Sequence, residues 1–263
     1  MTRQIRTELL KLRTTRLPYG VLALAAALTA LFALLEASQA GNGNSGVAPP
    51  FTASGLTTVT TVTGWSMLFA AVLGVITAAG EFRHQSATLT YLATPNRSRV
   101  LAAKATVAAG AGAIFGAVSA LIATGVGLGF VAAHSYHVAL GAGTLADHAA
   151  GATLGAALFG AIGVAVGSLI RSQLAGVIGV FVWGLVVESL IGGLFTSVRP
   201  YLPYTAATTL GGIKLGNAAF GPAHGLAGTA GPLPFPDAAT LVAAIAVAIA
   251  ALASRTTLTR DIT

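Results

Sequence analysis

Residues 80–104 read GEFRHQSATLTYLATPNRSRVLAAK and separate two long runs of sequence that carry no charge. Residues 37–80 on one side and 105–146 on the other contain no Asp, Glu, Lys or Arg, whereas the segment between them holds five charged residues. A helix that crosses a lipid bilayer needs about 20 mostly apolar residues, and both runs are long enough to supply one. The segment therefore predicts a polar connection between two membrane spans.

The composition of the whole chain points to the same class of protein. Only 8% of its 263 residues are charged and 55% are hydrophobic, whereas about 25% of the residues of a typical soluble domain are charged. A soluble fold with buried helices would need a polar surface that this chain cannot supply. The absence of cysteine excludes disulfides, thiolate metal sites and cysteine nucleophiles. We therefore expect an all-α polytopic membrane protein.

Six apolar segments are long enough to span the membrane, and we expect them to form one transmembrane domain over residues 1–263. The predicted transmembrane helices are residues 17–36, 58–80, 105–131, 149–169, 174–197 and 238–254. The first could be mistaken for a signal peptide, because it follows a basic start. Its apolar stretch of about 19 residues is longer than the usual 7–15 of a signal core, which favours an uncleaved span.

The basic residues predict the orientation of these spans. Twelve of the fourteen lie before the first span, in loop 81–104, in the fourth-to-fifth connection or in the C-terminal tail. Lys and Arg accumulate on the cytoplasmic side of membrane proteins. We therefore expect both termini in the cytoplasm. The net charge of +7 is explained by this topology, so no nucleic-acid partner is expected.

Glycines recur in the fourth predicted span at a spacing that favours close helix packing. Gly151 and Gly155 form one small-xxx-small pair, and Gly163 and Gly167 form another. In lipid, small residues let helix backbones approach closely. Dense packing within the bundle is the favoured interpretation, and a glycine-lined substrate path is the alternative.

The N-terminal segment MTRQIRTELLKLRTTRLPYG, residues 1–20, has the pattern of an amphipathic helix. Apolar residues recur at helical spacing, and the basic residues project elsewhere. Such a helix lies along the lipid headgroups with its apolar side down. The alternative is a basic tail that only sets topology. The predicted membrane-interface residues are Arg3, Arg6, Leu9, Lys11, Leu12, Arg13 and Arg16.

Loop 81–104 contains more structure than a simple connection requires. Residues 81–92 hold no Gly or Pro, and Thr94-Pro95-Asn96 then ends the predicted helix, because proline lacks a backbone donor and restricts the residue before it. A short helix held under the membrane offers a surface to a soluble partner. The alternative is a basic loop that serves topology alone.

TELLKLRTTR (residues 7–16) together with residues 81–104 resembles the permease subunit of a type-2 ATP-binding-cassette (ABC) exporter. Those permeases have Glu-Leu-x-Lys near the start, Glu-aromatic-Arg and a Pro-Arg turn after the second span, and Lys at the start of the third. The resemblance implies an amphipathic connecting helix at 3–16 and a cytoplasmic coupling helix at 82–93. It also implies a re-entrant element in the outer loop 198–237, which would include VRPYLPYTAATTLGG (residues 198–212). The residues it implies for ATPase coupling are Glu81, Phe82, Arg83, His84, Leu89, Leu92, Pro95 and Arg97.

The chain contains no Gly-x-x-x-x-Gly-Lys-Ser/Thr phosphate loop, so we do not expect it to be an enzyme or to bind a cofactor. The resemblance implies two copies of a separate ATPase subunit, which would hold ATP and Mg²⁺, and a second permease copy. It implies export of a hydrophobic or amphipathic substrate (a drug, an antibiotic or a lipid) across a bacterial plasma membrane. The alternatives are an ion-coupled secondary transporter, a membrane-integral enzyme or a scaffold. A proton-coupled transporter would be expected to carry several intramembrane ionisable groups.

Two polar features of the spans and outer loops remain. Glu188 lies inside the fifth predicted span, where a carboxylate is costly and therefore suggests a function. It either bonds a neighbouring helix or contacts substrate, and it is our candidate for the substrate path. His134, His137, Asp147 and His148 share an outer loop and have chemistry that suits Zn²⁺, but their spacing matches no strong motif, so no metal site is expected.

Overall fold

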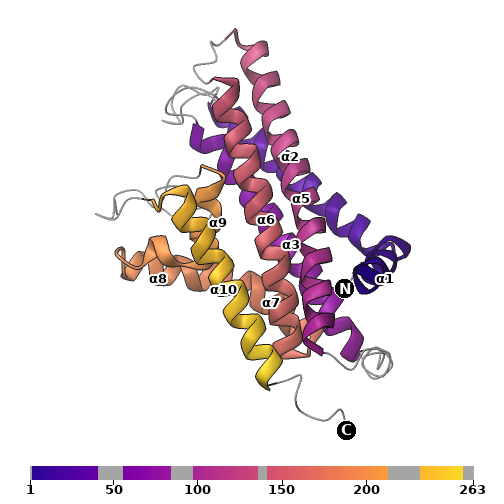
Figure 1. Cartoon of the computed structure of the whole chain (residues 1–263). Coiled ribbons are helices and arrows are strands. Elements are labelled where there is room, and N and C mark those ends of the chain that lie inside the picture. The colour runs from indigo at the N-terminus through magenta and orange to yellow at the C-terminus, as the bar shows by residue number, and fades with distance from the viewer. Residues whose placement is uncertain (1, 41–55, 84–96, 136–140, 213–231, 257–263) are drawn as a thin grey trace.

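The structure is a computed structural model, and it describes residues 2–40, 56–83, 97–135, 141–212 and 232–256. Within these ranges every regular element is helical, and six helical segments are long and apolar enough to cross a membrane (Figure 1). The prediction of an all-α protein with six spans is confirmed.

The described part of the chain forms the following elements in order. They are α1 (Thr2–Thr14), α2 (Leu17–Ala40), α3 (Leu56–Arg83), α5 (Arg97–Ala133), α6 (Ala142–Ile170), α7 (Gln173–Phe181), η1 (Val182–Val187), α8 (Glu188–Leu194), η2 (Arg199–Tyr201), α9 (Pro203–Leu210) and α10 (Phe235–Thr256). The span helices are α2, α3, α5, α6, the continuous run α7–η1–α8, and α10. Helix α5 begins eight residues before the predicted span, because no Gly or Pro interrupts the chain between Pro95 and Gly110.

Helix α3 lies at the centre of the bundle. In its apolar window 83% of the residues are buried, against 22% for α2, 17% for α7–α8 and 11% for α10. Its Met67, Leu68 and Leu73 are fully buried, and α3 packs against α2, α5, α6 and α7. The apolar faces of α2, α7–α8 and α10 are therefore directed outward.

Glycine backbone contact joins α6 to α3 and α5, which lie side by side in Figure 1. A methyl group added at Gly163 would overlap the backbone of Ala71 in α3, and one at Gly160 would overlap Ala108 in α5. Gly112 of α5 is similarly close to the backbone of Ala156. The prediction of close glycine packing in the bundle is confirmed at these positions.

The fifth span is interrupted in its middle by one turn of π-helix. The backbone N–H of Glu188 donates to the carbonyl of Trp183, five residues earlier, and the α-helix resumes as α8. Such turns are rare and often occur at functional sites. After α8 the chain turns back through η2 into α9, which packs against α3, α6 and α10.

Candidate coupling site at the ends of α1, α3 and α5

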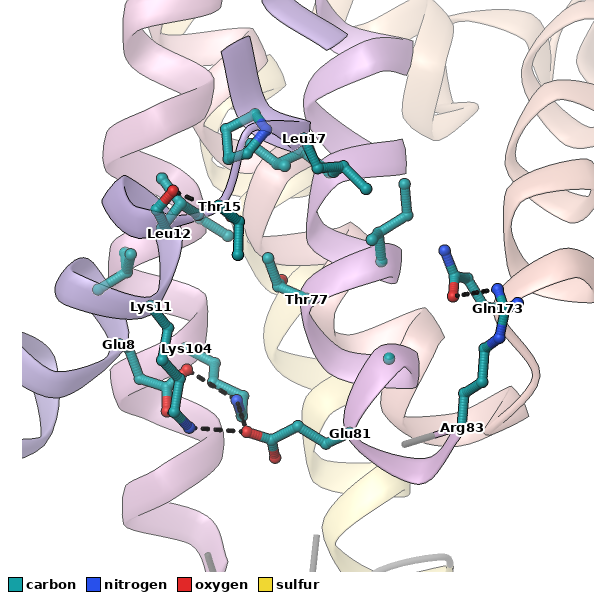
Figure 2. A pocket seen from close by; sticks show the side chains of 16 residues that line it. Glu8, Lys11, Leu12, Thr15, Leu17, Thr77, Glu81, Arg83, Lys104 and Gln173 are labelled. Atoms are coloured by element: carbon teal, nitrogen blue, oxygen red, sulfur yellow. Dashed lines mark hydrogen bonds and ion pairs between the residues drawn. The ribbon is translucent and has the colours of Figure 1, made fainter. Parts of the chain in front are cut away.

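Four charged side chains from three helices meet in one cluster (Figure 2). The Lys104 Nζ lies 2.7 Å from Glu8 Oε2 and 2.6 Å from Glu81 Oε1. The Lys11 Nζ lies 2.8 Å from Glu8 Oε1 and 2.9 Å from the same oxygen of Glu81. Each lysine thus bridges both carboxylates. We call these four residues the ion cluster; it joins α1, the end of α3 and the first turns of α5.

Most of the ion cluster is withdrawn from solvent. The Lys104 side chain is 6% exposed and both carboxylates are 11% exposed, whereas Lys11 is 47% exposed. A buried charge is costly unless it is paired, and removal of one partner leaves the others uncompensated. Lys104 is therefore the central member, while the half-exposed Lys11 contributes less because solvent screens its charge.

The two α1 members of the ion cluster keep their charges at neutral pH. Burial acts against the ionised carboxylate of Glu8, but Lys104 and Lys11 outweigh it, so the pKa of Glu8 lies below its usual value. Burial likewise acts against the ammonium of Lys11, but hydrogen bonds and attraction from Glu8 and Glu81 raise its pKa above the usual value. Four ion pairs join the side chains of the cluster, so the formal charges of its two lysines and two glutamates balance.

The next two residues of the motif contact a different part of the fold. The Arg171 Cζ lies 5.2 Å from the centroid of the Phe82 ring, a cation–π distance. The Arg83 Nη1 donates to Gln173 Oε1 at 3.3 Å. Arg171 and Gln173 lie at the tight turn between α6 and α7. Glu81, Phe82 and Arg83 therefore connect the end of α3 to α1 and α5 on one side and to this turn on the other.

The turn between α6 and α7 has a defined backbone. Arg171 adopts the left-handed conformation, with φ of 58°, and its N–H donates to the carbonyl of Gly167. Arg171 thereby caps the C-terminus of α6, whose last residue is Ile170. Ser172 then begins α7 by accepting a hydrogen bond from the Ala175 N–H at 3.4 Å. This short turn brings the side chains of Arg171 and Gln173 to the end of α3.

The other predicted coupling residues lie at or beyond the described chain ends. His84, Leu89, Leu92 and Pro95 lie outside the described residues, and Arg97 is the first residue of α5. The coupling helix expected at 82–93 therefore overlaps the described structure only at Phe82 and Arg83, where α3 ends. The role of these residues in ATPase coupling stays a prediction.

The predicted membrane-interface residues all lie in or just after α1. Leu12 packs against the hydrophobic core, whereas Leu9 is 41% exposed. Lys11 faces the bundle and belongs to the ion cluster. The exposed basic residues of this segment are Arg3, Arg6, Arg13 and Arg16.

Sequence reasoning did not bring Glu8 and Lys104 together. They are 96 residues apart in the chain, and no local sequence pattern at either residue predicts that it pairs with the other. The available signal was indirect: Glu8 and Lys104 are the acid and base of two of the motif elements that carry the family resemblance. Opposite charges at three helix ends on one side of a bundle could have suggested a pairing.

Glu188 is satisfied by four hydrogen bonds in the structure. Its Oε1 accepts from Trp183 Nε1 at 2.9 Å and from the backbone N–H of Tyr204 at 2.7 Å. Its Oε2 accepts from the Thr205 backbone N–H at 2.9 Å and from the Thr205 hydroxyl at 3.1 Å. The carboxylate, 3% exposed, thus caps the N-terminus of α9 from α8, where a negative charge is favourable. Of the two roles predicted for Glu188, these hydrogen bonds supply the bond to a neighbouring helix. Contact with substrate stays a prediction.

The histidines expected in an outer loop lie on different elements: His134 directly follows α5, whereas His148 lies inside α6, which begins before the predicted span. His148 Nδ1 lies 3.0 Å from the Gly211 carbonyl, and His134 Nδ1 lies 3.0 Å from the Phe130 carbonyl. His137 lies outside the described residues. Within the part of the chain that the structure describes, no three His, Cys, Asp or Glu side chains gather as metal ligands would.

Six helices of this length and apolarity are the architecture of a multi-pass membrane protein. A sequence profile of the family described as "ABC-2 family transporter protein" matches residues 4–198, which include the ion cluster and Glu188. The chain belongs to the ABC-2 transporter family, and the resemblance is confirmed. A search of the curated proteins found no match.

Proposed function

We propose that the chain is the membrane-spanning permease subunit of an ABC exporter in a bacterial plasma membrane, with both termini in the cytoplasm. It moves a hydrophobic or amphipathic substrate (a drug, an antibiotic or a lipid) out of the cell. Two copies of a separate ATPase subunit, which hold ATP and Mg²⁺, supply the energy. The observation that carries the proposal is the ion cluster at the end of α3, where the predicted coupling loop begins.

The contacts around α3 suggest how force on the loop would reach the spans. A push on residues 84–96 acts first on Glu81, Phe82 and Arg83. The bonds from Glu81 to the two lysines pass this displacement to α1 and α5. The contacts of Phe82 and Arg83 pass it to the start of α7. The loop thus acts on the bundle through several helices at once.

The outer face of the fifth span supports a second permease copy. Large apolar residues recur there every fourth position and are 44–77% exposed: Leu174, Ile178, Val182, Val186, Leu190 and Leu194. Residues four apart are neighbours on the surface of a helix, so these side chains form one continuous exposed row. We propose that this row packs against the second copy and that the substrate crosses between the copies, near α2, α3 and α7–α8.

The experiment that tests the function combines co-purification with transport. The chain is tagged and expressed together with the proteins encoded beside it, and we expect an ATPase to co-purify. Leu89→Asp with Leu92→Asp places two charges on the predicted docking side of the coupling helix. This double change should abolish co-purification and transport.

A charge-matched control separates docking from a general effect of added charge. Ala87→Asp with Tyr91→Asp changes the opposite side of the same predicted helix and should keep the ATPase bound. If no ATPase co-purifies and the Leu89/Leu92 variant transports normally, the exporter proposal fails. Both variants must first be shown to insert in the membrane in normal amount.

A further inference from the structure

A cavity of about 620 Å³ opens beside the ion cluster. It lies between the α1–α2 connection, α3 and the first residue of α7, with α5 contributing part of its wall (Figure 2). Its volume falls in the range of about 300–1,000 Å³ that is usual for pockets that bind small molecules. The proposed coupling mechanism leaves this space unused.

The two ends of the cavity differ in chemistry. Leu17, Leu73 and Ile76 form an apolar wall along the beginning of α2 and the inner part of α3. The other end holds the ion cluster together with Arg83 and Gln173. In Figure 2, Arg83 and Gln173 lie across the end of α3 from the cluster. A ligand that fills such a space has a polar head and an apolar tail.

The charge of the lining indicates the sign of the head. The four members of the ion cluster neutralise one another, which leaves Arg83 as the uncompensated charge. Among the described residues no carboxylate pairs with Arg83, and its partner is the neutral amide of Gln173 at 3.3 Å. A guanidinium presents several donors in a planar fork that matches phosphate oxygens. The polar end is therefore suited to a phosphate group.

We propose that the cavity binds an acidic phospholipid, with its phosphate on Arg83 and Gln173 and an acyl chain along Leu73 and Ile76. Basic pockets between helices on the cytoplasmic side of membrane proteins bind anionic headgroups. This side of the bundle carries the basic α1 and the charged end of α3. The bound lipid bridges α3 to the start of α7, beside the contacts proposed to carry force. It regulates the coupling site, and this regulatory role rests on the proposed function.

The binding measurement uses the full chain without any ATPase. Delipidated protein is titrated with phosphatidylglycerol or phosphatidylcholine in mixed micelles, and bound lipid is counted by native mass spectrometry. Both lipids carry a phosphate, but the choline ammonium of phosphatidylcholine offsets its charge and would lie near the cation of Arg83. We therefore expect phosphatidylglycerol to bind about tenfold more tightly. Arg83→Gln should remove this preference. Arg255→Gln changes an exposed basic residue outside the cavity and should preserve it.

A second variant tests the space without changing any charge. Gly80 lines the cavity, and a side chain added there would meet no atom within 4 Å. Gly80→Leu therefore fills part of the cavity. It should weaken phosphatidylglycerol binding about tenfold, because losing one hydrogen bond to a charged headgroup costs about that much affinity. Gly110 also has open space around it but does not line the cavity, so Gly110→Leu should bind lipid normally.

Three results would overturn the proposal. The first is equal binding of the two lipids, and the second is unchanged binding in Gly80→Leu. The third is movement of the lipid across the membrane when ATPase and ATP are added, because the lipid would then be cargo. Since binding is measured on the permease alone, loss of the lipid site leaves the proposed transport function standing. Failure to recruit an ATPase leaves the binding result unaffected.

Discussion

Lys104 illustrates how a single buried residue can hold several helices together. It reaches α1 through Glu8 and α3 through Glu81 while it belongs to α5 itself. In a membrane protein the drive to bury apolar surface between helices is weak, so polar contacts gain importance. The position of Lys104 at 6% exposure makes its two partners dependent on it.

We expect Lys104→Met to destabilise the protein by about 3–5 kcal/mol, because two nearly buried carboxylates would lose their buried counter-ion. Lys104→Arg keeps the charge and should cost less. The measurement is the melting temperature of the purified protein in detergent. Arg3→Met, at an exposed position of α1, is the matched loss of one positive charge and should change little. Equal melting temperatures for Lys104→Met and Arg3→Met would contradict the role of the cluster.

Glu188 calls for a different pair of substitutions, because two roles must be separated. Glu188→Ala leaves the N–H groups of Tyr204 and Thr205 without their cap, and we expect a loss of about 2 kcal/mol in stability. Glu188→Gln keeps an acceptor of the same shape but removes the charge. A Gln variant that is stable but transports poorly would assign Glu188 to the substrate path. A Gln variant that is normal in both, beside an unstable Ala variant, would assign it to the cap alone.

Among the elements, α5 and α6 together show that replacing a glycine has opposite effects according to what faces it. Gly163→Ala should destabilise the bundle by about 1–3 kcal/mol, because the added methyl group would overlap the α3 backbone at Ala71. Gly110→Ala faces open space, and the gain in helix propensity of up to about 1 kcal/mol should make it neutral or stabilising. Thermal unfolding of the two variants checks this difference in sign. A stable Gly163→Ala protein would show that the α3–α6 contact is looser than described.

The elements were predictable where composition alone decides them. The six spans follow from uncharged runs, and the close packing of Gly163 follows from its small-xxx-small spacing. The π turn before Glu188 was not predictable, because periodicity carries no signal for one extra residue in a turn. The pairing of Glu8 with Lys104 could not be derived either, since it depends on how three helices pack. The motif did identify Glu81 as important, but its partners came only from the fold.

For the whole molecule, the distribution of basic residues predicts which side faces the cytoplasm. The chain has no cysteine, so single cysteines can be introduced without background. We expect Ser38→Cys, at the far end of α2, to react with a membrane-impermeant maleimide in intact cells. Ser98→Cys, at the start of α5, should react only after the membrane is opened. Labelling of Ser98→Cys in intact cells would contradict the predicted topology and favour the opposite orientation.

The backbone contact of α6 with α3 and α5 indicates which helices move together and which can move separately. A joint made of backbone against backbone has no side chains that can rotate to a second arrangement, so we expect these three helices to move together as one rigid unit. The helices with the smallest buried share, α2, α7–α8 and α10, are the ones we expect to move relative to this unit. The distance between spin labels on α3 and α6 should therefore stay constant throughout a transport cycle. The distance between labels on α2 and α7 should change during the cycle.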